Sequence, residues 1–166
     1  RYTHPVRIKN VHVFDPKSGE RSDPVSVVVY GRHITGVQPK DTPGSGPEVV
    51  IDGEGGTLLP GLYEMHGHLG QNRALLNLAA GVTSVRDMGN NNAVLDRLSA
   101  AIEAGTLSGP RITRAGFIEG RSPFNSNNGY LVGSEAEALE AVRWYAARGF
   151  PQIKLYNSMR PDWSKA

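Results

Sequence analysis

The chain after Pro60 alternates between strand-like and helix-like segments, and this alternation constrains the fold more than any other feature. Strands are expected at residues 62–68, 82–87, 111–115 and 153–156, with helices between them at 74–80, 92–104 and 134–149. Gly81 and Gly149 stand where two helices return to a strand, as short helix-to-strand connections require. Such alternation is typical of parallel β/α units.

Two further patterns refine this segment. Ser134 and Glu137 have the spacing of a capping box and predict the start of the third helix. Residues 116–133 are rich in Gly, Ser and Asn, which predicts a long loop after the third strand. Because ligands in β/α folds bind beyond the carboxyl ends of the strands, we expect this loop on the functional side.

The first sixty residues have a different pattern, without helical periodicity. Apolar side chains recur at short spacing from Val6 to Val13, and residues 25–30 and 33–37 are two β-rich runs separated by Gly31-Arg32. The two runs predict a hairpin. The sequence therefore predicts a β region over residues 1–60, followed by a β/α region over 61–166.

Composition excludes several classes of function. The chain has 166 residues, a formal net charge of +2 and no cysteine, so disulfides, thiolate metal sites and a cysteine nucleophile are excluded. It has no basic run interleaved with aromatic residues, and no apolar run near the ~18 residues of a membrane helix. We therefore expect neither nucleic acid nor a membrane as a partner. The sequence does not indicate a cellular compartment.

His66-Gly67-His68 is the most informative short motif. Residues two apart in a strand point to the same face, so both imidazoles project together. Two neutral imidazoles on one face are natural ligands for zinc or a similar ion, although a structural or surface role is the simpler interpretation of the motif alone. Their place near the end of the first β/α strand favours the metal-binding interpretation.

Lys154 is the second candidate residue. It alternates with apolar neighbours in the fourth predicted strand, within Gln152-Ile-Lys-Leu-Tyr156. Most lysines in such a place hold the amine in water. The alternative is a buried amine that reacts with carbon dioxide to form a carbamate, an anionic oxygen ligand able to bridge two metal ions.

These residues resemble a known family. Residues 58–69, Leu-Leu-Pro-Gly-Leu-Tyr-Glu-Met-His-Gly-His-Leu, are similar to the Pro-Gly-Leu-Ile-Asp-x-His-x-His stretch of the amidohydrolase superfamily. The nearest branch contains imidazolonepropionases and prolidase-like enzymes. Residues 81–89 resemble its second barrel strand, residues 152–156 its carboxylated-lysine strand, and the hairpin with residues 51–53 its amino-terminal β-sandwich.

The resemblance implies an α/β fold: part of a β-sandwich over 1–60, then the first four β/α units of a (β/α)8 TIM-type barrel over 61–166. It implies that His66 and His68 bind the more buried of one or two divalent ions, with zinc expected, and that carboxylated Lys154 bridges two ions. The implied activity is hydrolysis of a C–N bond, of the amide or cyclic amide type, by a metal-activated hydroxide. The implied substrate is a small molecule or peptide-like.

The chain departs from the family pattern at two places near the motif. Glu64 stands where the family usually has aspartate, and Tyr63 where an aliphatic residue is usual. Glu64 shares a strand face with the histidines, so support for them from outside the metal's ligand shell stays open. Arg86 and Asp87 end the second β/α strand, where they either form an internal ion pair or contact substrate.

Length is the largest departure. Four β/α strands fit in this chain, whereas such a barrel has eight and typically about 250 residues. Two further histidines and a proton-handling aspartate are expected in a missing carboxyl-terminal half, so no catalytic acid or base is assigned here. We expect an amino-terminal portion of a larger enzyme that is inactive alone and pairs with that half; a homo-oligomer is also open. The alternatives are a non-enzymatic assembly module and metal binding without turnover.

Overall fold

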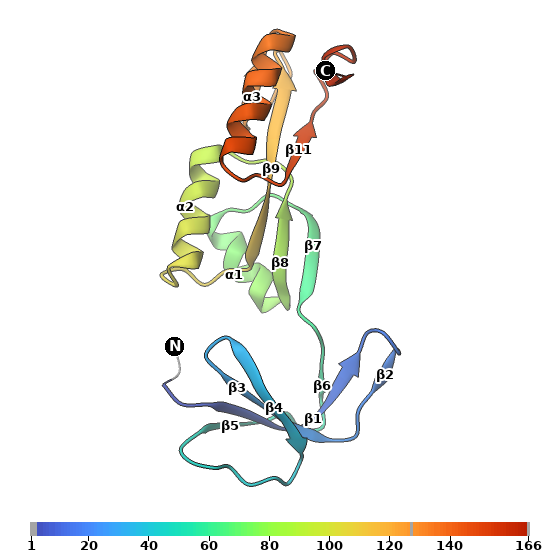
Figure 1. The fold of residues 1–166 in the computed structure, drawn as a ribbon, viewed down its shortest axis with the longest axis vertical. Helices are drawn as coiled ribbons and strands as arrows, with labels where there is room; N and C mark the ends of the chain where they lie inside the picture. The colour runs from blue at the N-terminus through green and yellow to red at the C-terminus, as the bar shows by residue number, and fades with distance from the viewer. Residues whose placement is uncertain (1–2, 127, 166) are drawn as a thin grey trace. The chain divides into compact units, whose positions relative to one another are not determined.

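The computed structural model describes residues 3–126 and 128–165, which divide into two compact units, 1–60 and 61–166 (Figure 1). Within the described residues, none of the helices has the length and apolar character needed to cross a membrane.

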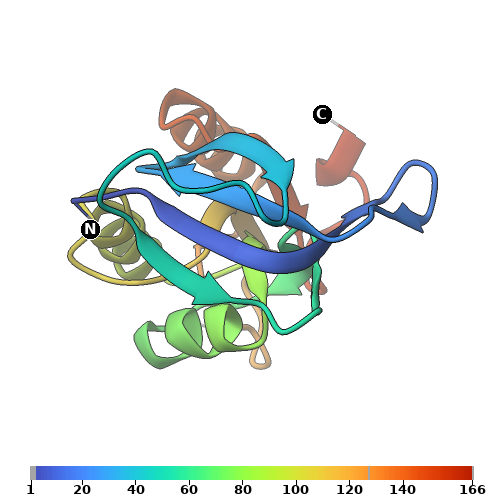
Figure 2. The ribbon, with the colours of Figure 1, turned by 90° about the horizontal axis from the view of Figure 1, so that it is seen from below.

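The first unit is a curled, mostly antiparallel sheet. Its strands are β1 (Val6–Asp15), β2 (Glu20–Arg21), β3 (Val25–Tyr30), β4 (His33–Pro39), β5 (Val49–Asp52) and β6 (Thr57–Leu58). β1 pairs antiparallel with β2 and β3, and parallel with β5 and β6. Figure 2 shows β1 between β3 and β5. The predicted hairpin is confirmed, because β3 pairs antiparallel with β4 up to Tyr30 and His33.

The second unit is a parallel sheet covered by helices. Its elements are β7 (Leu62–Gly67), α1 (Gln71–Ala79), β8 (Val82–Asp87), α2 (Asn92–Glu103), β9 (Arg111–Gly120), β10 (Tyr130–Val132), α3 (Glu135–Ala147), β11 (Gln152–Leu155) and the 3-10 helix η1 (Trp163–Lys165). β7 pairs with β8 and β8 with β9, while β10 and β11 also pair with β9. Every pair is parallel, which confirms the predicted fold class.

The long loop predicted over residues 116–133 is wrong at both of its ends. β9 continues to Gly120, and β10 adds a short parallel strand in which Tyr130 lies opposite Ile118. The glycines that suggested a loop serve close packing instead, since a Cβ on Gly116 would overlap the Tyr145 ring. Only residues 121–129 remain as the connection between these two strands.

The helix starts follow their caps. The Ser134 hydroxyl accepts a bond from the Glu137 N–H at 3.2 Å, and α3 begins at Glu135 as predicted. The Glu137 carboxylate bonds the N–H of Gly133 rather than that of the cap residue. By contrast, α1 begins at Gln71, three residues before the predicted start at 74, because Gly70 offers no side-chain cap to mark it.

Tyr145 is at the centre of the core between α3 and the sheet. Its side chain is fully buried and packs with Leu95, Ile118, Val132 and Phe150. The hydroxyl contacts two acceptors, the carbonyl of Phe117 at 3.0 Å and the Asn92 side-chain oxygen at 3.2 Å. α3 is therefore tied to the middle of β9, close to the residues described below.

Burial raises the pKa of the Tyr145 hydroxyl above its ordinary value. The folded chain therefore keeps this proton at a pH where the unfolded chain loses it, so stability should fall as pH rises above about 10. We expect Tyr145→Phe to lose about 1 kcal/mol of unfolding free energy at pH 7. Between pH 9 and 11.5 it should lose less further stability than the wild type in denaturant titrations. Tyr63→Phe, at an exposed position, is the control; equal pH slopes for Tyr145→Phe and wild type would contradict the prediction.

Candidate metal centre

His66 and His68 lie at the carboxyl end of β7. The pairing of β7 with β8 shifts register between Glu64 and Gly67, so the strand is irregular where it carries the first histidine. The two imidazole rings lie side by side, with centroids 5.4 Å apart and planes tilted by 60°. The structure therefore places these two predicted ligands together.

Lys154 reaches the same place from β11. Its Nζ lies 3.3 Å from Nε2 of His66, although the two residues are 88 positions apart in the chain. β7 and β11 are separated in the sheet by β8 and β9, which in a flat sheet is about 14 Å. The contact therefore requires both side chains to point to the concave face of a curved sheet.

A hydrogen bond to the backbone fixes the orientation of the His68 ring. Its Nδ1 lies 2.6 Å from the carbonyl oxygen of Gly89. Because a carbonyl only accepts hydrogen bonds, Nδ1 carries a proton, and in the neutral ring Nε2 keeps a free lone pair. This arrangement, with the second ring nitrogen bonded to a carbonyl, is usual for histidines that bind metals.

The spacing of the rings fits a shared ion. Two imidazoles that bind one zinc ion at about 2.0 Å and a tetrahedral angle have centroids roughly 5 Å apart. The observed 5.4 Å agrees with that value. Over residues 3–126 and 128–165, no three His, Cys, Asp or Glu side chains gather closely enough to hold a metal ion. Within this part of the chain, the donor set is two imidazoles and one amine.

Two aromatic side chains lie near the Lys154 amine. Its Nζ lies 4.9 Å from the ring centroid of Tyr156 and 5.8 Å from that of Phe117. These two rings are 5.1 Å apart. The Phe117 ring also lies against Gly89, where a Cβ would overlap it. Phe117 thus lies between Lys154 and the Gly89 backbone that orients His68. His66, His68 and Lys154 together form the His–Lys cluster.

Asp87 stabilises the backbone around His68 and Gly89, and the sequence did not predict this role. Its side chain is fully buried and accepts bonds from the N–H groups of Leu69 at 2.8 Å and Gly89 at 3.1 Å. The Asn90 side-chain amide donates to it at 2.9 Å. Asp87 therefore holds both backbone segments that flank the His68–Gly89 bond. An aspartate at the end of a predicted strand, two residues before a glycine, was the available signal.

The ion pair considered for Arg86 and Asp87 is wrong. The Arg86 Nε donates to the carbonyl of Met65 at 2.7 Å, while Asp87 points into the interior. Neighbouring residues in a strand face opposite sides of the sheet, which separates the two charges. Glu64 contacts the first histidine through its backbone, since the Glu64 carboxylate accepts the N–H of His66 at 2.7 Å.

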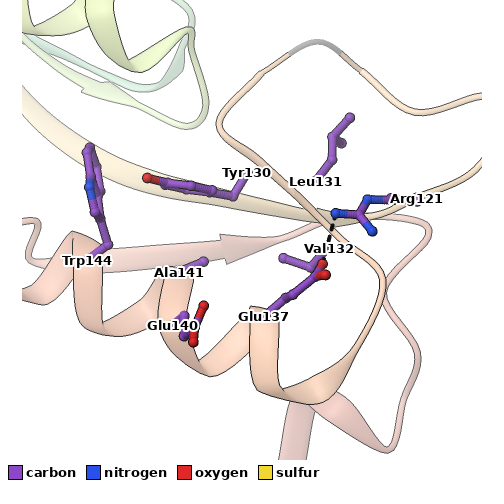
Figure 3. Close-up of a pocket in the computed structure, with 8 residues that line it drawn as sticks. All are labelled: Arg121, Tyr130, Leu131, Val132, Glu137, Glu140, Ala141 and Trp144. Atoms are coloured by element: carbon purple, nitrogen blue, oxygen red, sulfur yellow. Dashed lines mark ion pairs between the residues drawn. The ribbon is translucent and has the colours of Figure 1, made fainter.

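A separate groove lies between β10 and α3 (Figure 3). It has a volume of about 310 Å³ and includes none of the three predicted ligands. Arg121 and Glu137 on its wall form an ion pair with 3.0 Å between nitrogen and oxygen. The guanidinium of Arg148 lies 3.8 Å from the ring centroid of Trp144. Since these groups are already engaged within the chain, this groove does not compete with the cluster as the candidate site.

Comparison with known proteins identifies the fold. No protein-family model matches the chain, and no curated protein matches it. Among solved structures, a putative prolidase from Bifidobacterium longum aligns with 96% of this chain at a TM-score of 0.80 and 25% identity. A Xaa-Pro dipeptidase with methionine bound in its active site aligns with 91% at a TM-score of 0.74 and 26% identity.

A bottromycin amidohydrolase aligns with 96% of this chain at a TM-score of 0.71 and 20% identity, a likeness of fold alone. The chain spans less than half of each of these structures: 42% of the prolidase, 46% of the dipeptidase and 34% of the bottromycin amidohydrolase. The combination of a curled β unit and a parallel β/α unit therefore corresponds to one portion of a larger architecture.

Proposed function

Because this chain has the fold of part of the amidohydrolase superfamily, prolidase-like proteins included, we propose that it belongs to a metal-dependent hydrolase of C–N bonds. The supporting observation is that His66, His68 and Lys154 converge at the carboxyl ends of β7 and β11. In β/α barrels this edge of the sheet carries the active site. The similar solved structures include a putative prolidase and a Xaa-Pro dipeptidase, which supports the reaction class.

In this proposal His66 and His68 hold a divalent ion, zinc by preference, through their Nε2 atoms. When bound, the ion supplies Lewis-acid polarisation of the scissile carbonyl and of the attacking water. The neutral Lys154 amine adds to carbon dioxide, forming one C–N bond and releasing one proton. The resulting carbamate oxygens would add anionic ligands to those of the two histidines. Gly89 keeps the His68 ring in the required tautomer through its carbonyl.

The proposed substrate is a small amide or a peptide-like molecule. Phe117 and Tyr156 form an apolar wall beside Lys154, which would exclude water from one side of the cluster. The remaining ligands and the group that transfers protons are proposed to come from other strands of the same barrel.

Exposed apolar residues on β7 and β11 support such a completion. Within the described residues β7 pairs only with β8, and β11 only with β9. Leu62, Tyr63 and Met65 on β7 are exposed, as is Leu155 on β11. An unpaired apolar edge is unfavourable in water and favours pairing with further strands. We propose that polypeptide outside these 166 residues supplies those strands.

The proposed function is tested with the protein in the length that its gene encodes. Hydrolysis of a dipeptide ending in proline should occur with zinc and stop with a chelator, and His66→Ala should abolish it. His33→Ala, a histidine at an exposed position of β4, is the matched control and should keep wild-type turnover. Chelator-insensitive turnover, or turnover unchanged in His66→Ala, would overturn the proposal. The 166 residues alone should show little or no turnover.

The second candidate is a non-enzymatic assembly module, which the exposed edges of β7 and β11 also favour. It predicts stable binding of a partner without any dependence on zinc. A monomeric 166-residue chain that stays soluble would weaken the case for a required barrel partner.

A further inference from the structure

Glu119 is a second buried carboxylate at the carboxyl end of the parallel sheet, and the proposed mechanism does not use it. Its side chain is 1% exposed. Over the described residues it forms no ion pair with lysine, arginine or histidine. Burying a carboxylate without a cation costs free energy, which hydrogen bonds to the carboxylate partly offset.

The neighbours of Glu119 show which face of β9 it occupies. Ile118 packs on the helix side, in the cluster around Tyr145. Phe117 points to the opposite side, toward Lys154. Since strand residues alternate, Glu119 shares the face of Phe117 and Lys154 and lies one repeat nearer the carboxyl end of the strand.

Glu119 bonds the loop that follows its own strand. Its Oε2 accepts the N–H of Ser126 at 2.8 Å. The same loop is tied to the segment after β11, because the Ser158 hydroxyl donates to the Ser122 hydroxyl at 2.9 Å. The Ser122 hydroxyl also accepts the N–H of Phe124 at 3.2 Å. Residues 121–126 are thus held near one end by the contact of Ser122 with Ser158, and at the other end by the bond from Ser126 to Glu119.

This arrangement exposes one aromatic side chain at the functional edge of the sheet. Phe124 is 93% exposed, the most exposed large apolar residue in the described part of the chain. Its loop follows the carboxyl end of β9, and the histidines lie at the carboxyl end of β7. Parallel strands have their carboxyl ends at one edge, so loop and cluster share that edge.

We propose that Glu119 is a positioning residue that holds residues 121–126 so that Phe124 contacts an apolar side chain of the substrate. The inference rests on the proposed function and narrows it to substrates with an apolar group near the scissile bond. A fixed loop presents Phe124 without the entropy cost of ordering it at each binding event. Glu119 contributes through the Ser126 N–H and does not touch the substrate.

The first test measures the loop directly and needs no activity. Amide hydrogen exchange at Ser126 should be about tenfold faster in Glu119→Ala than in the wild type, because the variant loses one hydrogen bond. Glu119→Gln should stay within about twofold of wild type, because its amide oxygen accepts the same bond. Glu140→Ala, an exposed glutamate of α3, is the matched control. Equal exchange rates at Ser126 in Glu119→Ala and wild type would contradict the proposal that Glu119 holds the loop.

The second test uses the gene-encoded protein with two dipeptides, one with a leucine and one with a glycine side chain at the residue before proline. Phe124→Ala and Glu119→Ala should raise KM about tenfold for the leucine substrate only, with kcat within twofold, and Glu119→Gln should restore KM. Unchanged KM in an active protein would overturn this inference alone. An inactive wild type would overturn the proposed function. The exchange experiment would still decide whether Glu119 holds the loop.

Discussion

Single replacement of His66 or His68 by alanine should weaken zinc binding by this chain more than about 100-fold, and the double replacement should abolish it. Replacing a residue that hydrogen-bonds a metal ligand already lowers metal affinity by up to about 100-fold. Loss of a ligand itself should therefore lower the affinity further. The centroids of the two rings are 5.4 Å apart, and Nδ1 of His68 lies against the carbonyl of Gly89. Calorimetric titration with zinc at pH 7.5 measures the effect.

His33→Ala is the matched control for these titrations, because His33 lies at an exposed position in the other unit. It should bind zinc as the wild type does. Binding that survives in the double variant, or that falls equally in His33→Ala, would show that the ion binds elsewhere.

Lys154 is tested in the same titrations by adding bicarbonate. If the amine forms a carbamate, bicarbonate should tighten zinc binding or raise the number of ions bound in the wild type, and Lys154→Met should not respond. Lys165→Met, a change in the terminal 3-10 helix, serves as control. If bicarbonate did not change zinc binding by the wild type, the bridging role of Lys154 would be contradicted. The proposed role of His66 and His68 would not be affected.

Asp87→Ala should destabilise the chain by about 3 kcal/mol and weaken zinc binding by about 10- to 100-fold. The substitution leaves the N–H groups of Leu69 and Gly89 and the Asn90 amide without their acceptor in a buried place. Each buried unsatisfied donor costs about 1–3 kcal/mol, and water entering the cavity recovers part of that. Metal binding falls as well, because the same bonds hold the segments that orient His68.

Denaturant titration and zinc calorimetry measure the two effects. Asp96→Ala is the control, because Asp96 is half-exposed and its ion pair with Arg114, at 2.8 Å, should be worth at most about 1 kcal/mol. Asp87→Asn should lie between wild type and Asp87→Ala. A loss of stability without any loss of zinc affinity would show that Asp87 supports the fold but not the cluster.

Elements with strong local signals were predictable from the sequence. The hairpin of β3 and β4, the start of α3 at its serine cap and the strands β8 and β11 follow from turn chemistry, capping and alternation. β10 was missed because three residues are too few for a periodic pattern, and its pairing with β9 depends on residues distant in sequence. The start of α1 was missed because Gly70 has no side chain to act as a cap.

Within the candidate centre, the sequence by itself determined that His66 and His68 share a face, because alternation along a strand is a local property of the backbone. It also brought Lys154 forward through a strand pattern and a resemblance. Only the tertiary structure decided that the amine meets His66, that Asp87 points inward rather than toward Arg86, and that Glu119 holds the loop of Phe124. These contacts join strands through the curvature of the sheet, and curvature arises from the packing of all its strands and helices rather than from any one segment.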